Sequence, residues 1–399
     1  MLLVLLTMMS HLYDNLYKTI GLILAENGET RTLSLLRMTK NTINKVLRVI
    51  EEPLVFEYNS EYTDEDTNDI IHISKCKCFI SFGDGNSMVF DQIKKSYKYK
   101  VKGVYRIKIY KVDGGRIDHI LFPILTLNHM TNFITLGDIG IVNLDYLFSE
   151  SDFNAEISPN FNTSNITSMN SMFYECCLFN QPIGHCDTSN VKYMNYMFCE
   201  AISFNQPIGG WDVSQVTDMR AMFYGAVKFN QPIGNWDTSN VVNMNQMFSN
   251  AKNFNQPIGR WDVSQVTNMG AMFYSAVKFN QPIGNWTTSG VIKMGEMFSN
   301  AKNFNQPIGR WDVSQVTDMV AMFYGAIKFN QPIVNWITSN VINMSDMFNG
   351  AKSFNQPIDN WDVSNVTDMS DMFYGAKSFK QSTIDWNNRN TMLKGNISQ

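Results

Sequence analysis

The chain has 399 residues, of which 44% are apolar and 17% are charged, so it has enough apolar side chains for a buried core and is not a disordered protein. Its 32 basic and 36 acidic residues give a formal net charge of -4. Proteins that bind nucleic acid usually present a basic face, so this balance argues against a nucleic-acid partner.

Residues 1–52 form an apolar segment whose role the sequence does not indicate. The run from Met1 to Met9 is too short to span a bilayer, and Asp14 interrupts the apolar stretch that follows. The basic start of a signal peptide is missing, yet a degenerate signal, a weak anchor and membrane association stay open. Apolar residues at helical spacing between Leu36 and Ile50 predict an amphipathic helix that docks on the next domain or on a partner.

Residues 53–125 have the pattern of a small β domain. Val101, Val104, Ile107 and Ile109 lie among tyrosines and lysines as in β-strands, and the Gly-Asp-Gly sequence at 83–85 predicts a tight turn. The turn lacks the alternating acidic ligands and the final glutamate of an EF-hand calcium loop, so we interpret it as structural.

The same segment resembles a known domain type. FGDGN at 82–86 and YKYKVKGVYRIKI at 97–109 resemble the PKD-type β-sandwich, whose hallmarks are a Gly-Asp-Gly turn and a following Tyr, Gly and Tyr strand. This resemblance implies a small all-β sandwich over residues 53–125.

Residues 126–152 are expected to be a linker and the N-terminal cap of a repeat array that spans residues 153–386, with a polar tail at 387–399. The repeat has a period of 25 residues: phenylalanine recurs from Phe179 to Phe379, and all eight tryptophans of the chain follow the same period from Trp211 to Trp386. A period of 50 residues is superimposed, because tyrosine marks alternate repeats while Ser249 and Ser299 stand at the same position between them.

Each repeat can be divided by its apolar spacing. Met219, Met222, Phe223 and Ala226 are spaced like the apolar stripe of a short helix with Thr217 and Asp218 as its N-cap and first acidic residue. The stretch 210–216 predicts a short strand with Val213 and Val216 facing inward, and Pro207 and Gly209 predict a turn.

One repeat cannot bury these side chains alone, so the repeats are expected to stack. The predicted fold is a repeat solenoid, leucine-rich-repeat-like, with a short β-strand and a short helix in each coil and a parallel sheet between coils. In a stack, equivalent residues form columns that we expect to act as a structural ladder, with asparagine amides bonding to the next coil. The ladder residues are Asn205, Asn230, Asn255 and Asn280, and Trp211, Trp236, Trp261 and Trp286.

The repeat itself resembles a known family. FNQPIGNWDTSNVVNMNQMFSNAKN at 229–253 is similar to the 25-residue repeat of the BspA-like leucine-rich-repeat surface proteins, which also occurs in mycoplasma-type lipoproteins and in large DNA viruses. The resemblance implies a leucine-rich-repeat-like solenoid, an attachment or binding role at a cell or virion surface, and no catalytic residues. The cysteines are also compatible with a reducing compartment.

No catalytic, cofactor or metal site is predicted. The five histidines are scattered, and no phosphate loop, Gly-x-Ser-x-Gly or HExxH motif is present. The recurring aspartates after each tryptophan are replaced by Thr287 and Ile337, which favours a turn or capping role. Cys176, Cys177, Cys186 and Cys199, with His185, match no common zinc spacing and are interpreted as small buried side chains.

The sequence therefore favours a non-enzymatic protein-binding scaffold. Its partner-binding residues are predicted to be Tyr224, Tyr274, Tyr324 and Tyr374, because tyrosine is favoured at interfaces, although these side chains would equally serve to shield the helix surface. The alternatives are a structural component of an external coat, with self-association, and a carbohydrate-binding module that uses exposed tryptophans.

Overall fold

The computed structural model describes residues 53–62, 77–91, 97–111, 117, 119–137, 139–382 and 386. The predicted amphipathic helix before residue 51 and the tail after residue 386 lie outside these residues. Across the described ranges, no helix combines the length and the apolar character needed to cross a membrane.

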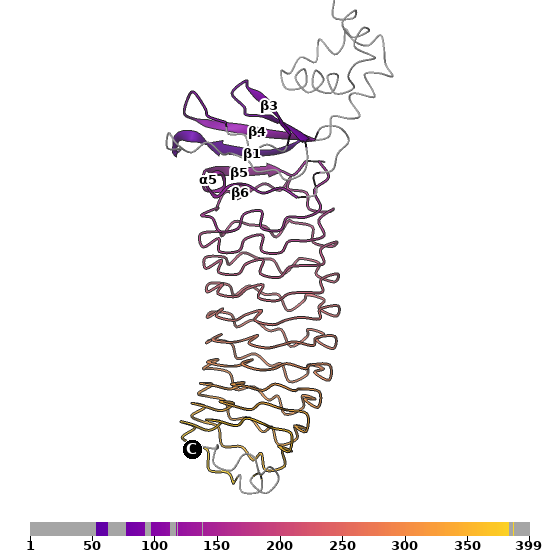
Figure 1. The fold of residues 1–399 in the computed structure, drawn as a ribbon, viewed down its shortest axis with the longest axis vertical. Coiled ribbons are helices and arrows are strands. Elements are labelled where there is room, and N and C mark those ends of the chain that lie inside the picture. The colour runs from indigo at the N-terminus through magenta and orange to yellow at the C-terminus, as the bar shows by residue number, and fades with distance from the viewer. Residues whose placement is uncertain are drawn as a thin grey trace, which may run out of the picture.

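The N-terminal part of the described chain is one six-stranded sheet in the order β3-β2-β4-β1-β5-β6 (Figure 1). Its pairs are antiparallel except for β5 with β6, which is parallel. The second sheet of the expected PKD-like sandwich is not among the described strands. The elements are β1 (Leu54–Asn59), a 3-10 helix (Ser60–Tyr62), β2 (Lys77–Ser81), β3 (Ser87–Asp91), β4 (Val104–Lys111), α5 (Ile124–Asn128), β5 (Met130–Thr135) and β6 (Glu156–Ile157).

The predicted tight turn joins β2 to β3. Gly83 and Gly85 have φ of 79° and 89°, a region that glycine enters without strain, and the N–H of Phe82 donates to the carbonyl oxygen of Asn86 at 3.0 Å. A Cβ on Gly83 would approach the carbonyl oxygen of Arg106 to 2.6 Å, so this turn packs against the backbone of β4. The predicted turn is confirmed as a structural feature of the hairpin.

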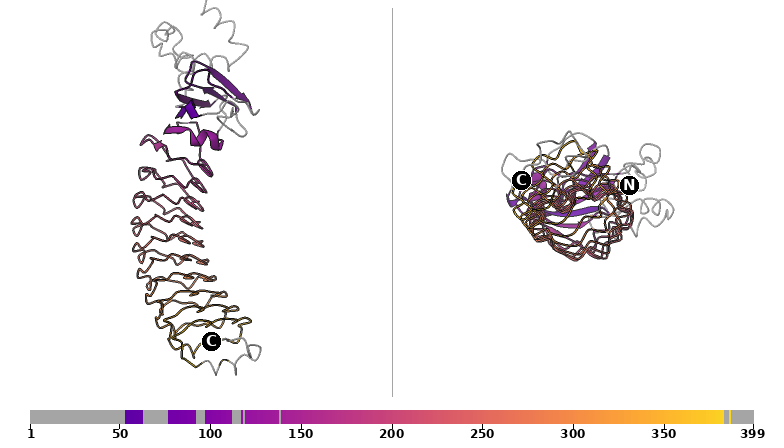
Figure 2. Two further views of the ribbon diagram at one scale, coloured as in Figure 1. Left: turned by 90° about the vertical axis from the view of Figure 1, so that its left-hand side faces the viewer. Right: turned by 90° about the horizontal axis from the view of Figure 1, so that it is seen from below.

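Beyond β6 the chain forms a long stack of coils that bends gently along its length (Figures 1 and 2). Parallel β-bridges join successive coils at residues 25 apart, such as Tyr193 with Asp218 and Asp218 with Asn243. The series starts at His119 and Asn143 and reaches Asp368. The 25-residue period of the sequence therefore corresponds to one coil, and equivalent residues lie in register.

The predicted helix at 219–226 is wrong, and turns take its place in every described coil. Alternate backbone N–H groups point along the stack instead of back along the chain: Ala221 donates to the carbonyl oxygen of Asn245 at 2.8 Å, and Phe223 donates to Met247 at 2.9 Å. Ala221 reaches this geometry with a left-handed φ of 51°. The apolar spacing is that of a helix, but hydrogen bonds between coils replace the bonds within a helix.

The predicted strand at 210–216 is also misplaced. Val213 and Val216 do face the core, yet the N–H of Val216 donates to the carbonyl oxygen of Val213 at 2.9 Å and closes a turn there. The parallel bridge falls at Asp218, so Thr217 and Asp218 are not the N-cap and first residue of a helix.

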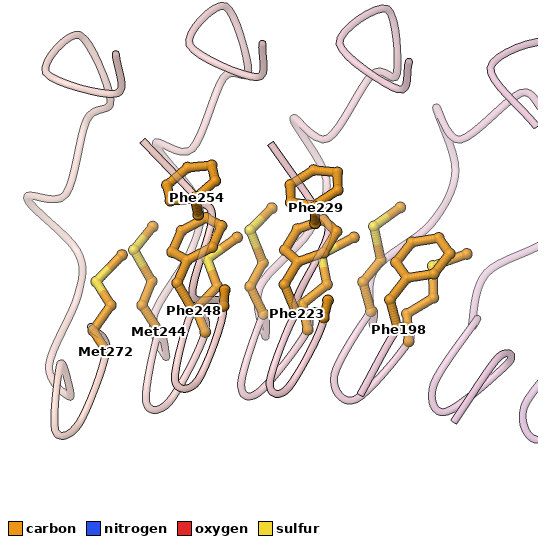
Figure 3. Close-up of a cluster of buried hydrophobic side chains, with 14 of the residues drawn as sticks. Phe198, Phe223, Phe229, Met244, Phe248, Phe254 and Met272 are labelled. Atoms are coloured by element: carbon orange, nitrogen blue, oxygen red, sulfur yellow. The ribbon is translucent and has the colours of Figure 1, made fainter. Parts of the chain in front are cut away.

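Stacked phenylalanines and methionines fill the centre of every coil (Figure 3). Phe223 lies 4.0 Å from Phe229 and 5.6 Å from Phe248, measured between ring centroids, with the rings nearly parallel. These side chains are fully buried, as is Met244. Each coil thus covers the apolar surface of its neighbours, and burial on this scale is the main stabilising contribution to such folds.

The segment 126–152 is an integral part of the fold and not a loose linker. Phe133 of β5 is fully buried, and its ring packs edge-on against Phe148 and Phe161, each 5.4 Å away between centroids. Phe56 of β1 stacks on the other side of Phe133 at 6.3 Å. The core is therefore continuous from the sheet into the stack of coils.

Candidate functional site

The tryptophan column is structural. Trp211, Trp236, Trp261 and Trp286 are at most 4% exposed. Each indole N–H donates to an isoleucine carbonyl oxygen of the preceding coil; for Trp236 the acceptor is Ile208 at 3.2 Å. Carbohydrate binding through exposed tryptophans is therefore excluded for these residues, because their indole faces are covered.

The asparagine column is the predicted ladder. The side-chain oxygen of Asn205 accepts the backbone N–H of Asn230 at 2.9 Å, and the same bond recurs from Asn230 to Asn255 and from Asn255 to Asn280. The side chain of Gln231 donates to the carbonyl oxygen of Asn205 at 2.9 Å. The irregular turn between coils therefore has its backbone groups satisfied by the neighbouring coil.

The recurring aspartates cap turns. The Oδ1 atom of Asp237 accepts both the N–H of Ser239 at 3.1 Å and its hydroxyl at 2.7 Å. These hydrogen bonds, from the hydroxyl first, lower the pKa of Asp237, and an equivalent pair from Ser314 lowers the pKa of Asp312. The predicted turn role matches this geometry.

Two columns of exposed charge recur at two different positions of the coil, and each is called an edge below. The aspartate edge consists of exposed residues that follow a tryptophan or its equivalent: Asp187, Asp212, Asp237, Asp262, Asp312 and Asp362. The lysine edge consists of exposed residues that precede the core phenylalanines: Lys228, Lys252, Lys278, Lys302, Lys328, Lys352 and Lys377. The lysine edge was not predicted, although one lysine stands one or two residues before each of these phenylalanines.

The four predicted partner-binding tyrosines lie along one side of the array. Tyr224 and Tyr274 are half-buried, whereas Tyr324 and Tyr374 are 39% and 60% exposed. Within the described chain, their hydroxyl groups make no hydrogen bond. Serines at the same position in intervening coils are buried, which agrees with partial shielding by the flanking tyrosines.

Four cysteines lie in the first coils, where Cys176 and Cys199 are buried and Cys177 and Cys186 are half-buried. Cys186 takes the place of the tryptophan one coil before Trp211, and Cys176 is fully buried. Burial raises the pKa of both thiols to about 12, so they are protonated at neutral pH and are poor metal ligands. The described residues include no group of three or more histidines, cysteines, aspartates or glutamates that could hold a metal ion.

A hollow of about 590 Å³ lies between β5 and the first coils, with Thr163, His185 and Asp187 in its wall. The Nε2 atom of His185 lies 3.1 Å from the carbonyl oxygen of Ser158, and the side chain of Asp187 caps the turn at Ser189. These polar groups are therefore engaged in structural hydrogen bonds, and the hollow brings together no nucleophile with a base.

Asp84 in the hairpin turn is also engaged structurally. Burial alone would raise its pKa, but hydrogen bonds from the Tyr97 hydroxyl and from Asn86 outweigh this effect and lower it. The ring of Tyr97 stacks on Phe82 with centroids 3.7 Å apart. The network locks the turn and leaves Asp84 fully occupied by partners within the domain.

A family model described as "Mycoplasma protein of unknown function, DUF285" matches residues 142–256, 228–323 and 296–397. Together these matches cover more than half of the chain and lie on the stacked coils. Comparison with curated proteins and with solved structures found no match.

Proposed function

The chain belongs to the DUF285 family of Mycoplasma proteins of unknown function, and we propose that it is a non-enzymatic scaffold that binds a protein partner along its array of coils. In this proposal the array is a leucine-rich-repeat-like solenoid of the BspA type, the sheet before it is a PKD-like domain, and the protein acts in attachment at a cell or virion surface. The repetition of one coil supports binding of a protein partner along the array, because a repeated surface adds many weak contacts in register.

The observation that carries the proposal is the row of tyrosines at 224, 274, 324 and 374. Two coils separate each from the next, which is about 10 Å if coils are spaced as parallel strands are. Their hydroxyl groups make no hydrogen bond within the described chain, and tyrosine hydroxyls normally find a partner when an interface buries them. An extended or repetitive protein surface would satisfy them.

Partner capture on the immobilised chain at about 500 mM salt, where charged surface contacts are screened, tests the proposal. Replacement of all four tyrosines by alanine should reduce capture at least tenfold, because truncating tyrosine anchors removes most of the interface energy. The matched control replaces Gln215, Gln265 and Gln315, which are exposed on another part of the coil, and should bind like the wild type. Equal capture by both variants, or no specific partner, would contradict the proposal.

A second candidate is a structural component of an external coat or virion surface. The observation that favours it is the shape of the array, an elongated stack whose coils repeat the same outline (Figure 1). In such a stack each coil presents the same outline, so one contact with a neighbouring molecule can recur from coil to coil.

A further inference from the structure

The lysine edge carries charge of one sign. In each coil from the fourth onward, the corner between the tyrosine column and the core phenylalanine, such as 224–229 or 249–254, contains one lysine and no acidic residue. No lysine of this edge forms an ion pair within the described chain. Burial, followed by the charge of Glu175, raises the pKa of Glu200. Lys252, near the N-terminal end of the lysine edge, partly offsets this rise.

The aspartate edge carries the opposite charge at the other end of the same segment. Within one coil, Lys228 directly precedes Phe229, and Asp237 directly follows Trp236, so the eight residues 229–236, which include a turn, separate the two charges in the sequence. Hydrogen bonds from Ser239 lower the pKa of Asp237 and so favour its charged form. Arg260 and Arg310 lie two residues before aspartates of this edge and offset only part of its charge.

Both edges share one spacing, because the same coils carry both. Parallel bridges set the distance between coils at about 4.8 Å, so successive lysines, and aspartates of adjacent coils, lie about 5 Å apart and repel one another. The aspartate edge is interrupted at Thr287 and Ile337, so an opposing edge in register places a counter-charge opposite most of these residues and relieves part of this repulsion. An edge from a second copy of the chain has this spacing by construction.

We propose that the chain associates side by side with copies of itself, with the lysine edge of one copy against the aspartate edge of the next. The contact is heterologous, so it does not close into a dimer and instead extends into rows. Each exposed ion pair is weak and sensitive to salt, so the association depends on many pairs in register and disappears at high ionic strength. This inference goes beyond the proposed partner binding, which uses the tyrosine side.

The observations favour a second copy over a polyanionic chain as the occupant of the lysine edge. The array carries six aspartates on its other edge and the whole chain has a net charge of -4, so a polyanion would meet repulsion as well as attraction. A copy of the chain instead uses both edges at once, and its aspartates have the coil spacing of the lysines except at Thr287 and Ile337.

Sedimentation velocity of the full chain tests the proposal. At about 20 mM salt the weight-average mass should rise with protein concentration, and at about 500 mM salt the chain should be a monomer. Reversal of Lys228, Lys252 and Lys302 to glutamate, in the coils that carry Asp237, Asp262 and Asp312, should weaken the low-salt association at least tenfold, which leaves a monomer at the concentrations used. The control, Lys192→Glu with Lys293→Glu, reverses exposed lysines of the array outside the edge and should associate like the wild type.

A charge exchange makes the test specific to the two edges. A second variant reverses Asp237, Asp262 and Asp312 to lysine, in the same coils as Lys228, Lys252 and Lys302 and at the position where other coils already carry Thr287 or Ile337. Each variant alone should be a monomer at low salt, whereas an equimolar mixture should associate again, which also shows that both variants are folded.

A wild-type chain that stays monomeric at low salt would overturn the proposal, and so would association that survives in either variant alone or fails to return in the mixture. A monomer that binds polyglutamate through these lysines would assign the edge to a polyanionic partner instead. Partner capture at high salt is unaffected by any of these results, so the two proposals fail independently.

Discussion

The sheet and the stack of coils place their residues in different ways. In the sheet, Phe56 is held by two unlike neighbours from distant parts of the chain, opposite Ile107 on β4 and Phe133 on β5. In the stack, Phe279 lies between Phe254 and Phe304, which are its own equivalents 25 residues away on either side. The stack therefore repeats one packing arrangement, whereas each pair of residues in the sheet has its own. The effect of a substitution in one coil should therefore predict the effect of the same substitution in the next coil.

The largest expected effect comes from the phenylalanine column. Phe279→Ala should lower the free energy of unfolding by about 3–5 kcal/mol, because it empties a fully buried ring position. Phe254→Ala should have the same effect to within about 1 kcal/mol, measured by urea denaturation. Ile292→Thr, at a 43% exposed position where neighbouring coils carry threonine, is the control and should be nearly neutral. A loss below about 1 kcal/mol for Phe279→Ala would contradict the account.

The next effect concerns the asparagine ladder. Asn280→Ala removes the acceptor of the Asn305 N–H, a bond of 2.9 Å, and leaves that half-buried backbone group without its partner in the neighbouring coil. The free energy of unfolding should fall by about 1–3 kcal/mol. Asn285→Ala, which changes an exposed asparagine five residues later, should change it by less than about 0.5 kcal/mol. Equal effects in the two variants would mean that the ladder bond contributes nothing to stability.

A smaller effect, opposite in sign, tests the backbone of the coil. Glu296 is exposed and has a left-handed φ of 58°, which costs about 1 kcal/mol for a residue with a side chain. Glu296→Gly should therefore raise the melting temperature slightly. In a helix the same change would lower stability by a similar amount, so a lower melting temperature would favour the helix that the apolar spacing predicts.

The sequence predicted the parts of the fold that depend on side-chain position. The period, the inward-facing Val213 and Val216 and the Gly83–Gly85 turn are confirmed, because each follows from residue type and spacing. The partner-binding role of the tyrosines stays a prediction.

The backbone path within a coil was not predictable in the same way. The helical spacing of Met219, Met222 and Phe223 is shared by the observed turns, and a left-handed alanine such as Ala221 carries no mark in the sequence. The lysine edge was not predicted, because the number of residues from one lysine to the next alternates between 24 and 26 up to Lys352. The lysines therefore do not share one position of the 25-residue repeat.

The smallest expected effect is a difference between the sheet and the stack of coils in how their stability depends on pH. Burial raises the pKa of Tyr58 to about 12, and burial followed by the hydrogen bond to Asp84 raises that of Tyr97 to about 12. Because folding raises the pKa of Tyr58 and Tyr97, their contribution to the free energy of unfolding is complete below pH 10. This contribution is lost as the pH rises through about 12.

Hydrogen exchange during an alkaline titration should therefore show loss of protection in the sheet. Tyr97→Phe removes one of these groups and should make the loss less steep. Loss of protection before the sheet in the coils after Cys199, which contain no thiol, would contradict this order.

The central claim is that each coil depends only on the coils beside it. Deletion of residues 251–300 tests it most directly, because the new junction joins Asn250 to an Ala-Lys-Asn-Phe sequence identical to the one it replaces. We expect a folded monomer at high salt with native-like circular dichroism, shorter by about 10 Å in small-angle scattering, as two coils spaced like parallel strands require. An unfolded or aggregated product would show that the coils depend on more than their neighbours and would contradict the claim.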